Sequence, residues 1–137
     1  MKASRRSAGR PRDVVACVVR DTRGHLLVGR RPSHKRHGDL WEFPGGKVRD
    51  DETLGEAAKR ELAEELGVRV IETDADPTFV ALDEEGDFRI VFLRVRIEGT
   101  PRLLEHVELR WIDPLAPLEL RFAPADLAYV TTISAGL

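Results

Sequence analysis

Three glutamates in the segment KRELAEELGV, residues 59–68, have the clearest capacity for chemistry: Glu61, Glu64 and Glu65. The segment has the spacing of an amphipathic helix. At about 100° per residue, Glu61 and Glu65 fall among the apolar positions and not opposite them. Carboxylates four residues apart on a helix repel each other, and partial burial would strengthen the repulsion until one carboxyl took up a proton. A positive partner is therefore expected beside the pair.

Two kinds of positive partner are available. Arg60 is adjacent, and an ion pair with it would make these glutamates an ordinary charged helix face. The alternative is a divalent cation, because oxygen ligands without His or Cys favour Mg²⁺ or Mn²⁺, which are usually shared between a few carboxylates and substrate phosphates. The preceding segment favours the cation: Gly45 and Gly46 would let the backbone approach a ligand closely, and Glu52 adds a carboxylate.

The elements that must position these residues follow from hydrophobic periodicity. The β-branched segment 13–20 predicts a buried strand, with residues 25–31 as its hairpin partner after a DTRG turn. A helix is expected over residues 53–66, capped by Thr53 or Asp51 and ended by Gly67. Further strands are expected over 68–74, 78–85, 87–98 and 108–113, and a second helix over 124–133. This order predicts an α/β or α+β sandwich and not a doubly wound sheet.

Composition limits the classes of protein to be considered. The chain has 137 residues, a net charge of −2 and one cysteine, Cys17, which indicates one domain without an internal disulfide. Its apolar runs are too short to span a bilayer and no signal peptide is evident, so a soluble, cytoplasmic protein without a membrane partner is expected. Residues 1–12 are basic and are predicted to form a disordered arm, with the folded domain over 13–137. The body has no basic stripe with interleaved aromatics, so no stable nucleic-acid partner is expected.

From Gly46 to Val68 the chain resembles the Nudix box, which is Gly, five residues, Glu, seven residues, Arg-Glu, an aliphatic residue, any residue, Glu-Glu, any residue, Gly and an aliphatic residue. The fixed positions are filled by Gly46, Glu52, Arg60, Glu61, Leu62, Glu64, Glu65, Gly67 and Val68. Outside the box, the segments RR (30–31), LWEFPGGK (40–47), LRW (109–111) and APAD (123–126) resemble the MutT-type branch. That branch includes pyrophosphohydrolases of oxidised nucleotides and of cytidine nucleotides.

The resemblance implies a single-domain α-β-α sandwich with a mixed sheet. It also implies Mg²⁺- or Mn²⁺-dependent hydrolysis of a nucleoside triphosphate to the monophosphate and pyrophosphate. The implied metal ligands are Glu61, Glu65, Glu64 and a backbone carbonyl of Gly45 or Gly46. Arg60 would hold the glutamates in place, with Glu52 as its partner.

The general base implied by the resemblance is Glu105, which lies six residues before Trp111. It would act as base or as an additional metal ligand, with Glu64 and Glu52 as the next candidates. The alternative for Glu105 is an exposed acidic loop. His106 is expected at the surface or behind the ligands, and not as the base.

For substrate binding, Arg31 matches an arginine that contacts phosphate in MutT-type proteins, although it could be only a charged strand end. Asp126 fills the position at which this branch reads the base edge, and its alternative role is to cap the last helix. A carboxylate there favours a base that presents hydrogen-bond donors, such as cytosine, guanine or an oxidised purine. Phe79 is the first candidate to stack on the base, with Phe88 and Phe122, although core packing suits all three.

Two readings from other functional classes remain. A non-catalytic Nudix module could sense a nucleotide, but such modules usually lose glutamates of the box, and all are present here. An isomerase of the isopentenyl-diphosphate type needs a catalytic cysteine in a different context from that of Cys17. The sequence is compatible with a monomer or a homodimer.

Overall fold

The computed structural model describes residues 11–116 and 119–135. In chain order its elements are β1 Arg12–Val19, β2 Leu26–Arg30, β3 Trp41–Glu42, β4 Gly45–Lys47, α2 Leu54–Leu66, β5 Arg69–Thr73, β6 Phe79–Leu82, β7 Phe88–Glu98, β8 Glu108–Ile112 and α3 Pro124–Ser134. The predicted basic arm lies almost entirely outside the described residues. Within the described ranges, no helix is long and apolar enough to cross a membrane.

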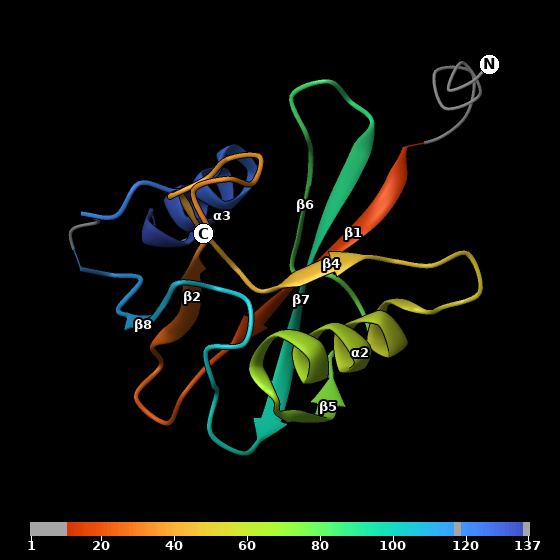
Figure 1. Ribbon diagram of the computed structural model, residues 1–137, viewed down its shortest axis with the longest axis horizontal. Helices are drawn as coiled ribbons and strands as arrows, with labels where there is room; N and C mark the ends of the chain where they lie inside the picture. The colour runs from red at the N-terminus through yellow and green to blue at the C-terminus, as the bar shows by residue number, and fades with distance from the viewer. Residues whose placement is uncertain (1–10, 117–118, 136–137) are drawn as a thin grey trace.

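The strands form two sheets (Figure 1). One has the order β4-β1-β7-β5, with β6 also paired to β7, and the other has the order β3-β2-β8. Strands β1 and β7 are parallel, whereas the other pairs are antiparallel, so the larger sheet is mixed as predicted.

The expected hairpin between the first two strands is wrong. Strands β1 and β2 lie in different sheets and meet only at a bridge between Arg20 and Leu26. Each is buried along most of its length, and each has a neighbouring strand along both of its edges. These neighbours are β4 and β7 for β1, and β3 and β8 for β2. The turn after β1 therefore carries the chain from one sheet to the other.

The two helices lie on opposite sides of the strands, and each covers its own hydrophobic core (Figure 1). Alternate residues of β1 serve both cores, because successive side chains of a strand point to opposite faces. Val15 and Cys17 pack with α2, whereas Ala16 and Val18 pack on the side of α3. The predicted single-domain α-β-α sandwich is confirmed.

Helix α2 has defined ends. Thr53, one of the two predicted caps, accepts a hydrogen bond from the Glu56 amide, while Glu56 accepts one from the Thr53 amide in a capping box. Gly67 ends the helix with a left-handed φ of 67°. Both signals are local, which explains why the sequence indicates them correctly.

Candidate active site

The acidic face of α2 packs directly on the glycine pair of β4. Glu65 is only 5% exposed, and the Gly45 amide lies 3.3 Å from its Oε1, to which it donates a hydrogen bond. A Cβ at Gly46 would lie 2.4 Å from the Glu61 carboxylate carbon. A side chain at Gly46 would therefore displace the Glu61 carboxylate from its present place beside β4.

Arg60 binds the acids of the motif as predicted. Its Nε and Nη2 donate to Glu52 over 2.7 and 2.8 Å, and its Nη1 donates to Glu61 over 2.8 Å. Nη2 also donates to the Lys47 carbonyl, and half-exposed Glu64 lies 3.6 Å from Nη1. The bonds to Arg60 hold the pKa of Glu52 down to about 2.

Glu65 differs from Glu61 because it has no ion pair with an arginine or lysine among the described residues. Burial raises the pKa of Glu65 far above its usual range, and the adjacent carboxylates of Glu61, Glu42 and Glu105 raise it further. The alternative of an ordinary ion-paired helix face therefore does not account for Glu65. A divalent cation would relieve this repulsion.

The chemistry of the donors suits a hard cation, because they are all oxygens. Within residues 11–116 and 119–135, no three His, Cys, Asp or Glu side chains already converge on one point. Coordination would therefore also draw on backbone oxygens, such as those of Gly45 or Gly46, or on substrate oxygens. The residues of α2 and β4 thus fit the predicted cation as part of a ligand set.

A polar cavity of about 490 Å³ opens at this acidic face, and we call it the acidic cavity. Its lining includes Glu61, Glu65 and the predicted base Glu105, which is exposed on the loop before β8. Basic and neutral residues of the β2–β3 loop form the other wall: Arg31, Pro32, His34 and Lys35. The structure thus brings Glu105 to the glutamates of α2.

Glu42 and His106 also line this cavity. No site role was assigned to Glu42 from the sequence, and His106 was expected at the surface or behind the ligands. Glu42 accepts a hydrogen bond from Arg31 Nη1 over 2.9 Å, and its second oxygen lies 3.0 Å from His106 Nε2. Arg31 also donates from Nε to the Arg36 carbonyl. The only sequence signal for Glu42 was its place in the LWEFPGGK segment, which resembles the MutT-type branch. Its contact with His106 spans 64 residues and has no local signal.

A second cavity, of about 280 Å³, adjoins the first. We call it the base cavity because it contains Asp126, the residue predicted to contact the nucleotide base. The two share Arg31, Glu42 and Gly45 as lining residues. The rest of its lining is largely apolar and includes Phe43, Phe88, Ile90, Ala123, Pro124 and Ala125.

Asp126 lines the base cavity but does not cap α3. The cap is Ala123, without a side-chain hydrogen bond, and Asp126 lies in the first turn, so the capping alternative is wrong. Asp126 is 8% exposed and accepts a hydrogen bond from the Phe43 amide over 2.9 Å. Burial raises its pKa to about 8.

Phe79 lies in the core and does not line the base cavity. Its ring packs against Phe92 and Tyr129, with centroids 5.7 and 5.5 Å apart. Phe88 lines the cavity in its place, and Lys47 Nζ lies 5.2 Å from the centre of its ring. Phe79 pairs with Phe92, which lies on the same face of β7 as Phe88. The alternation along the strands therefore does not show which of the two rings borders a cavity.

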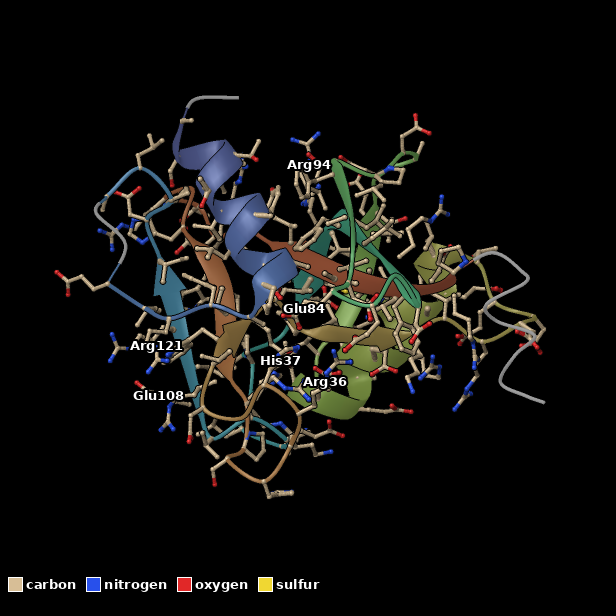
Figure 2. The ribbon with its side chains drawn as sticks, turned by 90° about the horizontal axis from the view of Figure 1, so that it is seen from above. Arg36, His37, Glu84, Arg94, Glu108 and Arg121 are labelled. Carbon is tan, nitrogen blue, oxygen red and sulfur yellow. The ribbon has the colours of Figure 1, made fainter. Side chains whose placement is uncertain are left out.

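Charged residues tie two loops together at the edge of the base cavity (Figure 2). Arg36 of the β2–β3 loop lies 2.6 Å from Glu85 and 3.7 Å from Glu84, and His37 lies 3.7 Å from Glu84. Both glutamates belong to the β6–β7 turn. We call this set the Arg36 bridge.

Comparisons with known proteins agree with this geometry. The family model described as NUDIX domain matches residues 10–132. The CTP pyrophosphohydrolase of Escherichia coli is 36% identical over 119 residues, covering 84% of this chain and 85% of that protein. The 8-oxo-dGTP diphosphatase of Proteus vulgaris is 42% identical over 57 residues, covering 42% of this chain and 51% of that protein.

Among solved structures, one from a study of MutT from Aliivibrio salmonicida and Vibrio cholerae is similar, with a TM-score of 0.79 and 28% identity. The match covers 93% of this chain and 100% of that chain. The chain belongs to the NUDIX family. It is a hydrolase of that family with MutT relatives, as the sequence predicted.

Proposed function

We propose that the protein is a nucleoside triphosphate pyrophosphohydrolase that uses Mg²⁺ or Mn²⁺ and releases a nucleoside monophosphate and pyrophosphate. The observation that carries the proposal is the pair of adjoining cavities, one acidic and one apolar, which share Arg31, Glu42 and Gly45. A triphosphate chain suits the first cavity, with a cation between it and the acids, and a base suits the second. The names of the CTP and 8-oxo-dGTP relatives support cytidine or oxidised purine nucleotides as substrates, and nucleotide-pool sanitation as the role.

The cation would be held by Glu61 and Glu65, joined by Glu64 and by a backbone oxygen of Gly45 or Gly46. When bound, it would neutralise charge on the phosphate oxygens and lower the pKa of water. Arg60 fixes Glu61 through the ion pairs described above, and Glu52 fixes Arg60. Arg31 would bind phosphate, since Glu42 and the Arg36 carbonyl hold its guanidinium at the border of the two cavities.

Glu105 is the proposed acceptor of the proton from the attacking water. It is exposed to the acidic cavity, so it can reach both solvent and the metal ligands. Glu52 is less suited, because Arg60 holds its pKa near 2 and occupies both of its oxygens. Glu64 is half exposed and lies near Arg60, which makes it the second candidate.

The base would lie among the apolar residues of the base cavity, with its edge toward Asp126. A protonated carboxyl offers one donor and one acceptor, which matches a base edge that presents an amine beside a ring nitrogen acceptor, as cytosine does. Its ionised form would instead accept from two donors, as on guanine or an oxidised purine. Stacking by Phe79 is not part of this proposal, because its ring lies in the core.

The test is release of pyrophosphate from CTP, dCTP, 5-methyl-dCTP, 8-oxo-dGTP and dGTP with Mg²⁺ or Mn²⁺. We expect hydrolysis of at least one of these nucleotides and none without the cation. Binding without hydrolysis would instead support a non-catalytic nucleotide sensor. An isomerase is disfavoured because Cys17 is buried in β1, where burial raises the pKa of its thiol. The cytoplasmic location, and the state as monomer or homodimer, stay predictions.

A further inference from the structure

His106 is a buried polar residue in an otherwise exposed loop. Its side chain is 4% exposed, whereas Leu103, Leu104, Glu105 and Val107 around it are all exposed. A histidine between exposed neighbours would ordinarily be solvated, so specific contacts must hold its ring inside.

The first of these contacts is with the backbone of β2. A Cβ at Gly29 would lie 2.6 Å from both Cγ and Cδ2 of the His106 ring, which is closer than atoms can approach. The ring therefore occupies the space that a side chain at Gly29 would fill. Only glycine at this position leaves room for His106.

The second contact is with Glu42. His106 Nε2 lies 3.0 Å from one oxygen of Glu42, and Arg31 Nη1 lies 2.9 Å from the other. The three residues come from separate segments: Arg31 from the β2–β3 loop, Glu42 from strand β3 and His106 from the loop before β8. Because Arg31 fixes Glu42, Glu42 is a rigid hydrogen-bond partner for His106.

The same loop carries Glu105, whose carboxylate borders the acidic cavity. Backbone hydrogen bonds secure the loop at its two ends, from Arg102 to the Leu66 carbonyl and from Val107 to the Arg30 carbonyl. Between these ends, His106 is the one side chain that is buried. Its contacts with Gly29 and Glu42 therefore tie the residue next to Glu105 to β2 and β3.

We propose that His106 is a positioning residue, which holds the loop Leu103–Val107 on β2 through Glu42 and so keeps Glu105 at the acidic cavity. The inference rests on the proposed function, in which Glu105 accepts the proton from water. His106 itself transfers no proton, because its Nε2 is engaged by Glu42, and its Nδ1 is buried without a hydrogen-bond partner among the described residues. Displacement of a catalytic group by about 1 Å can lower a rate on the order of 100-fold, so a loosened loop should slow turnover.

The first test is a double-mutant cycle on kcat, measured with the full chain on the best nucleotide of the panel at saturating Mg²⁺. His106→Ala should lower kcat on the order of tenfold and change KM by less than about twofold, since no substrate contact is lost. The variant Glu105→Gln should be slower still. The double variant should be no slower than Glu105→Gln alone, because His106 acts only through Glu105. A double variant slowed by the product of the two effects would overturn the proposal.

The second test does not depend on activity. Amide hydrogen exchange should accelerate in His106→Ala at the hydrogen-bonded amides of Leu104 and Val107 and remain unchanged in α2. The variant His106→Gln, whose amide nitrogen reaches about as far as the histidine Nε2, should keep slow exchange and recover much of kcat, and it also serves if the alanine variant does not fold. His25→Ala is the matched control: it changes a histidine of the β1–β2 turn, outside both cavities, and should match the wild type in both measurements.

The outcomes distinguish a failure of the positioning role of His106 from a failure of the proposed hydrolysis. Unchanged exchange in a slow His106→Ala variant would overturn only the positioning role. A Glu105→Gln variant as fast as the wild type would overturn both the base assignment and the positioning role. A wild-type protein that hydrolyses no nucleotide of the panel would remove the proposed function, and exchange in Leu103–Val107 alone would then decide whether His106 holds the loop.

Discussion

The acidic cavity and the base cavity share three lining residues but are built in different ways. In the first, the residues proposed to hold the cation come from α2 and β4, which are joined by one short turn, whereas Arg31, Glu42 and Glu105 come from other segments. The second is assembled from β1, β4, β7, two loops and the start of α3. The proposed metal site is thus encoded locally, in one motif, whereas the proposed base recognition depends on how distant segments meet.

The largest expected effect concerns Glu65 of the acidic cavity. Glu65→Gln should lower kcat at least about tenfold, through loss of a metal ligand. Without added metal, it should raise the temperature of thermal unfolding, because a buried carboxyl crowded by other acids is replaced by a neutral amide. Steady-state kinetics checks the fall in kcat, and thermal melting curves check the rise in the unfolding temperature. Glu98→Gln, in an exposed ion pair with Arg69, is the control, and unchanged turnover in Glu65→Gln would remove this residue from the mechanism.

Next in size is the effect of Asp126 in the base cavity. Asp126→Asn should change the ratio of kcat/KM between cytosine and purine nucleotides on the order of tenfold, with less change in the highest kcat. Steady-state kinetics on the panel checks this, with the exposed Asp76→Asn as control. Equal slowing of all the nucleotides would contradict a base-reading role.

The same variant tests the raised pKa of Asp126. With a pKa near 8 when folded and 3.8 as its ordinary value, the folded protein keeps a proton that the unfolded chain releases between these values. The contribution of Asp126 to stability should therefore decline as the pH rises from about 4 to 8 and then level off. Denaturant unfolding of the wild type and Asp126→Asn at several pH values measures this difference. A difference independent of pH would contradict the shift.

Glu52 should show the opposite dependence on pH. Arg60 lowers its pKa from 4.5 to about 2, so the folded protein releases a proton that the unfolded chain retains between these values. The stabilisation is complete above about pH 4.5 and is lost as the pH falls through 2. Glu52→Gln should therefore be less stable than the wild type at pH 6 and nearly equal to it near pH 2. An equal deficit at both values would rule out this pair as the cause.

The smallest expected effect is at the Arg36 bridge. Its ion pairs are exposed, so Arg36→Ala should change KM by no more than about threefold, and salt should reduce the difference further. Titration of KM against ionic strength checks this. Arg69→Ala removes a similarly exposed pair away from both cavities. A large change in kcat would mean that the bridge also shapes the acidic cavity.

The same contrast explains what the sequence could predict. Helix α2 and both of its ends follow from spacings within one short segment, and the Arg60–Glu52 pair follows from the resemblance of that segment to the Nudix box. The pairing of β1 did not, because the turn after it has the chemistry of a hairpin, whereas the strand pairs with β4 and β7. The contacts of Glu42 with His106 and of Phe43 with Asp126 span 64 and 83 residues, and no local pattern encodes them.

The capped ends of α2 have a consequence for selectivity among ions. Thr53 and Gly67 stabilise the two ends of the helix, and so help to hold the backbone positions of its crowded acids. In the proposed metal site, the spacing of the ligands would thus depend in part on residues that do not coordinate the ion. A substitution at either end should change the preference between Mg²⁺ and larger ions while every coordinating side chain remains in place.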